Sequence, residues 1–122
     1  MKTEVRQARR VRELETPEGC FILEVANDGG DDVSISRARV PPGITTEWHR
    51  LTGIAERYVI VSGAGRVELE PSIAQNVSVG DVVRIPPGVA QRITNTGIDD
   101  LIFFCVCTPR FRQDCYQAIK NR

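Results

Sequence analysis

Short stretches in which apolar and polar residues alternate recur along most of the chain, separated by glycine, proline and asparagine. The clearest stretch runs from Val33 to Val40, where Ser34, Ala38 and Val40 share one parity and the arginines share the other. A period of two is typical of β-strands with one buried face. Similar patterns cover residues 45–51, 56–62, 66–70, 81–85 and 91–95. The sequence therefore predicts an antiparallel β-sandwich or barrel.

The two most apolar stretches differ from this alternating pattern. Residues 20–26 form a short apolar run, and residues 101–107 are apolar at both parities. A strand that is apolar on both faces is either central in its sheet or covered by a partner subunit. Residues 71–76 are expected to form a loop, and Asp114–Lys120 a short C-terminal helix with its acid near the start and its base near the end.

The length and composition limit the classes of protein that need to be considered. The chain has 122 residues, enough for one domain with one core, and its 16 basic residues equal its 16 acidic residues. This balance gives no reason to expect a nucleic-acid or anionic-membrane partner. No apolar run is long enough to span a membrane, and the charged N-terminus lacks the apolar core of a signal peptide. We expect a cytoplasmic protein.

Residues 1–18 are rich in charges of both signs and poor in apolar residues. We interpret them as an N-terminal arm, followed by a single domain over residues 19–122. The four cysteines include Cys105 and Cys107, whose spacing does not fit a C-x-x-C zinc or redox motif. In a reducing cytosol we expect all four to be free thiols.

Two segments carry the regularly spaced residues on which a functional hypothesis depends. In the first, Gly43, His49, Glu56 and Gly63 follow the pattern G-x5-H-x-H-x4-E-x6-G, with Leu51 in place of the second histidine. In the second, the pattern G-x5-P-x-G-x2-H-x3-N is matched at its glycines, proline and asparagine, whereas Gln91 replaces the histidine. The matching residues of the second segment are Gly80, Pro86, Gly88 and Asn95.

The two patterns resemble the conserved motifs of the cupin superfamily, and the chain looks like a small single-domain bacterial cupin. The resemblance implies an all-β fold, a double-stranded β-helix or jelly-roll barrel, to which we add the short C-terminal helix. It also implies that the histidine and glutamate positions of the motifs point into the barrel. In the family, three histidines and the glutamate bind a divalent metal, for which iron, nickel, manganese and zinc are candidates.

The resemblance places the candidate metal ligands at His49, Glu56 and Gln91, with the fourth position taken by Leu51. Leucine cannot bind a metal, and a glutamine oxygen is a weak neutral ligand, so we expect weak metal binding or none. Glu47 has the parity of His49 and is a candidate second carboxylate. Cys105 and Cys107 also share one parity, which leaves open whether both thiols face the pocket.

We predict a pocket that binds a small molecule through a hydrogen-bonded group of polar side chains. Gln91 suits this role because its amide both donates and accepts hydrogen bonds. The candidate pocket residues are His49, Glu56, Gln91, Tyr58 and Glu47. The alternative is a metal-dependent cupin enzyme, of dioxygenase or isomerase type, that uses His49 and Glu56 with other ligands. The apolar strand at 101–107 and the outward parity of Trp48 favour a homodimer.

Overall fold

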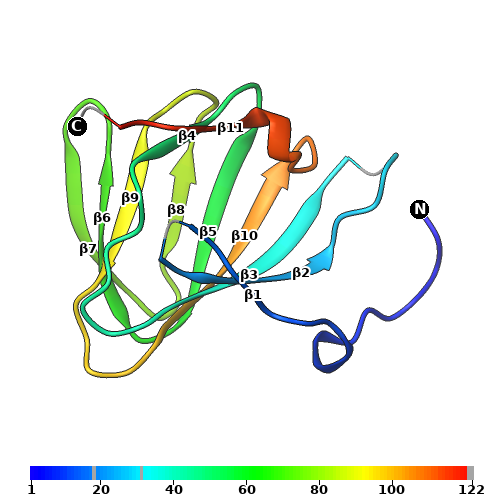
Figure 1. The fold of residues 1–122 in the computed structure, drawn as a ribbon, viewed down its shortest axis with the longest axis horizontal. Coiled ribbons are helices and arrows are strands. Elements are labelled where there is room, and N and C mark those ends of the chain that lie inside the picture. Colours follow the sequence, from blue (N-terminus) through cyan, green and yellow to red (C-terminus); the bar gives the residue numbers. More distant parts are fainter. Residues whose placement is uncertain (18, 31, 121–122) are drawn as a thin grey trace.

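The computed structural model describes residues 1–17, 19–30 and 32–120 and consists of two antiparallel sheets facing one another (Figure 1). The first sheet has six strands in the order β1-β2-β3-β10-β5-β8, and the second has five in the order β11-β4-β9-β6-β7. The strands are β1 (Leu14–Glu15), β2 (Phe21–Ala26), β3 (Ser34–Val40), β4 (His49–Leu51), β5 (Ala55–Ser62), β6 (Ala64–Leu69), β7 (Ile73–Ser78), β8 (Val82–Ile85), β9 (Gln91–Asn95), β10 (Leu101–Thr108) and β11 (Tyr116–Ala118). This arrangement confirms the predicted jelly-roll barrel.

The barrel core lies between the two sheets, where the inward residues of each strand meet. Along β10 the burial alternates strictly, so that Leu101, Phe103, Cys105 and Cys107 are buried and the residues between them are partly exposed. β10 is central in its sheet, paired with β3 on one side and with β5 on the other. The inward side chains of β10 are thus buried in the barrel, and its outward side chains lie on the outer surface of the sheet.

The glycine and asparagine residues of the two motifs hold the turns of the barrel. Gly63 joins β5 to β6 with a φ of 86°, and a Cβ atom there would lie 2.7 Å from the backbone oxygen of Asp100. Both the dihedral angle and the close approach require glycine. Asn95 is buried, and its side-chain amide donates to the backbone oxygens of Val40 and Asp99, both at 2.8 Å. These motif residues therefore act as parts of the scaffold.

The structure corrects three expectations about secondary structure. Residues 114–120 do not form a helix: a 3₁₀ turn at Gln113–Cys115 leads into β11, which pairs with β4. Residues 73–76, expected in a loop, belong to β7, an edge strand that pairs with β6. The stretch 45–51 is regular only at His49–Leu51, after an isolated bridge between Thr45 and Thr94. Within the described residues, no helix is long and apolar enough to cross a membrane.

The N-terminal residues lie beside the end of the barrel at which β1 and β2 meet (Figure 1). After a 3₁₀ turn at Ala8–Arg10, Leu14 and Glu15 of β1 pair with Ile22 and Phe21 of β2. Leu14 and Glu15 thus form the edge strand of the first sheet. Its acid Glu13 binds the guanidinium of Arg39 on β3 at 2.8 Å.

Candidate functional site

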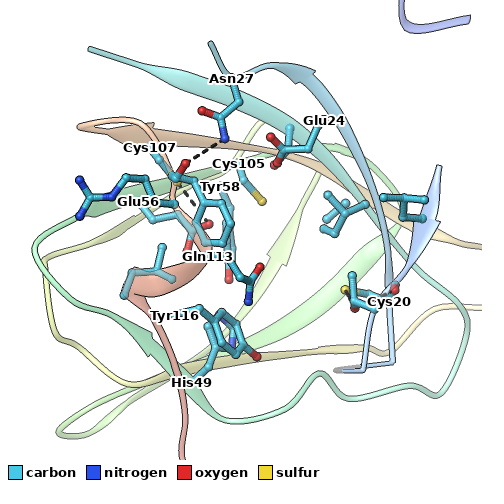
Figure 2. Close-up of a pocket in the computed structure, with 18 of the residues that line it drawn as sticks. Cys20, Glu24, Asn27, His49, Glu56, Tyr58, Cys105, Cys107, Gln113 and Tyr116 are labelled. Atoms are coloured by element: carbon cyan, nitrogen blue, oxygen red, sulfur yellow. Dashed lines mark hydrogen bonds between the residues drawn. The ribbon is translucent and has the colours of Figure 1, made fainter. Parts of the chain in front are cut away.

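A cavity of about 650 Å³ opens at the end of the barrel where the two terminal segments gather (Figure 2). Residues from both sheets and from both terminal segments line it. From the first sheet come Leu14, Ile22, Glu24, Ser36, Ala38, Glu56, Tyr58, Phe103, Cys105 and Cys107; from the second, His49, Leu51 and Tyr116; from the remaining segments, Thr16, Pro17, Cys20, Asn27, Glu47, Arg110, Phe111, Arg112 and Gln113. A cavity of this size accommodates a small organic molecule.

His49 lies on the cavity wall, with only 6% of its surface exposed. Its Nδ1 atom is 2.8 Å from the backbone oxygen of Glu47. A carbonyl oxygen only accepts hydrogen bonds, so Nδ1 carries the proton, and in the neutral ring Nε2 carries the lone pair. The ring of Tyr116 stacks on the imidazole at a centroid distance of 4.9 Å and an interplanar angle of 17° (Figure 2). His49 is thus held in one orientation and one tautomer.

Glu56 and Cys107 lie on neighbouring strands of the first sheet, where they form a cross-strand pair. The thiol of Cys107 donates to the Glu56 carboxylate over 3.8 Å (Figure 2). Burial and the nearby charge of Glu56 raise the pKa of Cys107 to about 12. Cys107 is therefore a neutral thiol at physiological pH and can donate to the carboxyl group of Glu56.

Gln91 and Tyr58 form a buried pair, in which the tyrosine hydroxyl donates to the glutamine Oε1. Gln91 is 1% exposed and pairs with His49 across β4 and β9. It does not belong to the cavity lining, whereas Tyr58 does. The structure thus places Gln91 outside the cavity lining, joined by a hydrogen bond to Tyr58, which is part of that lining.

The other sequence-based candidates also have definite positions. Glu47 lines the cavity, but its carboxylate binds the hydroxyl of Tyr116 at 3.0 Å and the amine of Lys120 at 2.5 Å. Cys105 and Cys107 both face the cavity, and each cysteine of the described chain is a thiol rather than half of a disulfide. Trp48 does not line the cavity; its ring lies 4.7 Å beneath the guanidinium of Arg92.

These side chains do not fit a resident transition metal. Nowhere in the described part of the chain do three histidine, cysteine, aspartate or glutamate side chains meet in a group that could hold a metal ion. At the family's ligand positions, Leu51 has no donor atom and the Oε1 atom of Gln91 accepts the hydroxyl of Tyr58. The two remaining ligands are fewer than the three that a facial triad supplies.

Sequence reasoning missed the residues that the terminal segments bring to the cavity. Tyr116 and Arg110 follow the last long strand, and Asn27 lies in the turn after β2. Asn27 accepts from the guanidinium of Arg110 at 3.3 Å and donates to the backbone oxygen of Phe111 at 2.9 Å. Neither cupin motif reaches these positions, and only their place in the folded barrel relates them to the site.

The comparisons with known proteins agree with this architecture. The profile of the cupin domain matches residues 36–107, which is more than half of the chain. The chain belongs to the cupin domain family. No curated protein sequence matches it.

Several solved structures share the fold of this cupin at low sequence identity. KdgF from Halomonas sp. is 20% identical, with a TM-score of 0.79 over 91% of this chain and 98% of that one. Pac13, described as a nucleoside dehydratase, is 14% identical, with a TM-score of 0.82 over 98% and 92% of the two chains. CapF from Staphylococcus aureus is 23% identical, with a TM-score of 0.77 over 90% of this chain and 34% of its own. At these identities the likeness concerns the fold alone.

Proposed function

We propose that this cupin binds a small organic molecule in the barrel cavity through hydroxyl or N–H groups of that molecule, without a resident transition metal. The observation that carries the proposal is the pairing of two buried acceptors on one cavity, the Nε2 atom of His49 and the carboxylate of Glu56. They come from opposite sheets, so a ligand between them can be held from two sides. The apolar walls around them, including Phe103 and Leu51, favour a ligand with an apolar part.

The hydrogen-bonding groups of the inner wall support this choice of ligand. The Tyr58 hydroxyl donates a hydrogen bond to Gln91, and the Cys107 thiol donates one to Glu56. The Tyr58 hydroxyl and the Cys107 thiol are therefore both directed at acceptors of the protein itself. A ligand carboxylate beside Glu56 would meet a second acidic group in a poorly solvated site, whereas an alcohol or amine can donate to His49 and Glu56. Neutral hydroxylated compounds and amines are accordingly the first candidates.

A second function is supported by the same two residues. An imidazole with one fixed tautomer and a buried carboxylate are the groups that general acid–base catalysis requires. The chain would then be a cupin enzyme of isomerase or dioxygenase type that uses His49 and Glu56. The metal-dependent form of this alternative needs ligands beyond the two retained.

A ligand screen by thermal unfolding tests the proposal. The panel contains uridine, chosen because Streptomyces PAC13 variants were solved with uridine, together with monosaccharides, amines, phenolics and organic acids. A compound that binds only the folded state at 100 times its Kd adds about 2.7 kcal/mol to the free energy of unfolding. We expect a hydroxylated or amine compound to raise the Tm of wild type, and the rise to disappear in His49→Ala and Glu56→Gln. Stabilisation by organic acids alone would refute the proposed ligand chemistry.

Elemental analysis of the purified protein separates the two functions. Stoichiometric iron, nickel, manganese or zinc that disappears in His49→Ala supports the metal-dependent enzyme. Metal far below one equivalent in wild type, combined with ligand binding, supports the metal-free pocket. Conversion of a bound compound to product by the metal-free protein would assign acid–base catalysis to His49 and Glu56.

We also propose a homodimer formed through the outer face of the six-stranded sheet. Phe104 on β10 and Val59 on β5 are paired on this face, and Val82 on β8 beside them is 57% exposed. An apolar face of this kind favours association. Light scattering at micromolar concentration tests the proposal, with Phe104→Asp as the variant expected to dissociate. A monomeric wild type would contradict it.

A further inference from the structure

The C-terminal strand β11 contacts His49 through both its backbone and a side chain. Ala118 pairs with His49 in the sheet, and the backbone N–H of Ile119 donates to the oxygen of Trp48 at 2.9 Å. Tyr116, at the other end of β11, stacks its ring on the imidazole. The last described residues thus hold one face of His49.

The C-terminal segment, residues 116–120, also binds the side chain of Glu47. Glu47 precedes β4 in a stretch without regular secondary structure, and its backbone oxygen accepts from Nδ1 at 2.8 Å. Its two carboxylate oxygens are bound separately, Oε2 by the Tyr116 hydroxyl at 3.0 Å and Oε1 by the Lys120 amine at 2.5 Å. One glutamate therefore joins the imidazole to both ends of the C-terminal segment.

We infer that Tyr116 and Glu47 are positioning residues that set the tautomer and the ring orientation of His49. The side chain of Glu47 fixes the peptide whose carbonyl selects the Nδ1–H form, and the ring of Tyr116 prevents rotation of the imidazole. Only one ring nitrogen can then act as an acceptor toward the cavity. The consequence for ligand binding rests on the proposed function, whereas the control of the tautomer does not.

The charges around Glu47 agree with this role. Its hydrogen bond from Lys120 lowers the pKa of the Glu47 carboxyl, and the bond from Tyr116 lowers it further against the opposing effect of burial. The group is thus an ionised acceptor at neutral pH, able to accept from both partners. Charge-assisted hydrogen bonds of this kind are shorter and stronger than neutral ones.

Nitrogen NMR of the histidine ring tests the inference directly, because His49 is the only histidine in the chain. A long-range ¹H–¹⁵N correlation spectrum of the labelled protein, without ligand, is expected to show a protonated Nδ1 and an unprotonated Nε2. In Glu47→Ala and Tyr116→Ala the ring is expected to give a mixture of both tautomers. Tyr116→Phe keeps the stacking ring but loses the bond to Glu47, and should give an intermediate result.

A matched control comes from Glu13, another glutamate whose carboxylate is bound by a cation, here Arg39, but far from His49 in the sequence. Glu13→Ala should leave the imidazole signals unchanged. Backbone amide spectra establish that each variant is folded, and Glu47→Gln, which retains an acceptor oxygen, should restore most of the wild-type tautomer. This rescue separates positioning from a general loss of structure.

Two outcomes would overturn the inference. One is an unchanged Nδ1–H tautomer in folded Glu47→Ala and Tyr116→Ala; the other is an Nε2–H tautomer in wild type. If the tautomer changes as expected while no compound of the ligand panel binds wild type, the positioning role stands and the proposed function fails. If a ligand binds wild type while folded Glu47→Ala keeps the Nδ1–H tautomer, the proposed function stands and the positioning role fails.

Discussion

The buried pair of Tyr58 and Gln91 offers the most direct test of how the centre of this barrel is built. Both side chains are nearly inaccessible, with 3% and 1% of their surface exposed, and they join β5 of one sheet to β9 of the other. The hydroxyl of Tyr58 donates to the Oε1 atom of Gln91. Tyr58→Phe removes this donor but preserves the ring, whose centroid lies 4.5 Å from that of the Phe103 ring.

The expected cost follows from the burial of the amide. A buried acceptor left without its donor costs about 1–3 kcal/mol of the free energy of unfolding. Gln91→Leu removes the acceptor instead and is expected to cost a similar amount. In the double variant both polar partners are gone, so the total cost should fall short of the sum by about 1–2 kcal/mol.

Urea unfolding followed by tryptophan fluorescence measures these costs, since the chain has one tryptophan. The four proteins of the cycle must have equal m-values, so that differences in midpoint report stability alone. Glu13→Gln combined with Gln91→Leu serves as an uncoupled control pair and should be additive within about 0.5 kcal/mol. A Tyr58→Phe cost below about 0.5 kcal/mol, with no coupling, would refute the hydrogen bond as a stabilising feature.

Three further predictions follow from other contacts. The hydrogen bond from Arg39 lowers the pKa of Glu13 from its ordinary 4.5, so Glu13→Gln should lower the free energy of unfolding by about 0.2–1 kcal/mol at neutral pH. Urea titrations should show that this difference between variant and wild type vanishes as the pH falls through the lowered pKa. With a pKa of about 12, Cys107 is thiolate in roughly 1 part in 10⁴ at pH 8, and mass spectrometry should find it unalkylated by iodoacetamide until the protein unfolds. The double variant Leu51→His with Gln91→His should bind nickel about 100-fold more tightly than wild type by calorimetry, which is close to 3 kcal/mol.

The sequence predicted the barrel because its motifs consist of residues that the turns require. Gly63 could be placed at a turn from its neighbours in the chain, since few other residues adopt its positive φ. Strand alternation also predicted that Glu56 and Tyr58 share a face, and the resemblance to the cupin motifs implied that the face of His49 and Glu56 is the inward one. These properties are local, so one sequence was sufficient to read them.

The parts that could not be predicted depend on contacts between distant segments. Tyr116–Ala118 has no strong strand pattern and becomes a strand because it pairs with β4, which lies far earlier in the chain. β7 has mainly exposed residues along its length. Its sequence therefore lacks the alternation of apolar and polar residues that predicts a strand. The pairing of Gln91 with Tyr58 likewise depends on how the two sheets face one another, which parity alone does not specify.

The residues at the family's former ligand positions form a consistent set. With an apolar side chain at Leu51 and an amide at Gln91, the tyrosine hydroxyl has an acceptor and His49 lies between a carbonyl and an aromatic ring. The hydrogen bond at Nδ1 keeps Nε2 as the acceptor atom of the His49 ring, whereas the bond from Tyr58 occupies the one oxygen of the Gln91 side chain. Either Leu51→His or Gln91→His would bring the candidate ligands to three, the number in a facial triad, and Gln91→His would also remove the bond from Tyr58. We therefore expect Gln91→His alone to raise nickel affinity by less than the double variant, which supplies all four ligands of the family, and calorimetry of both proteins measures the difference.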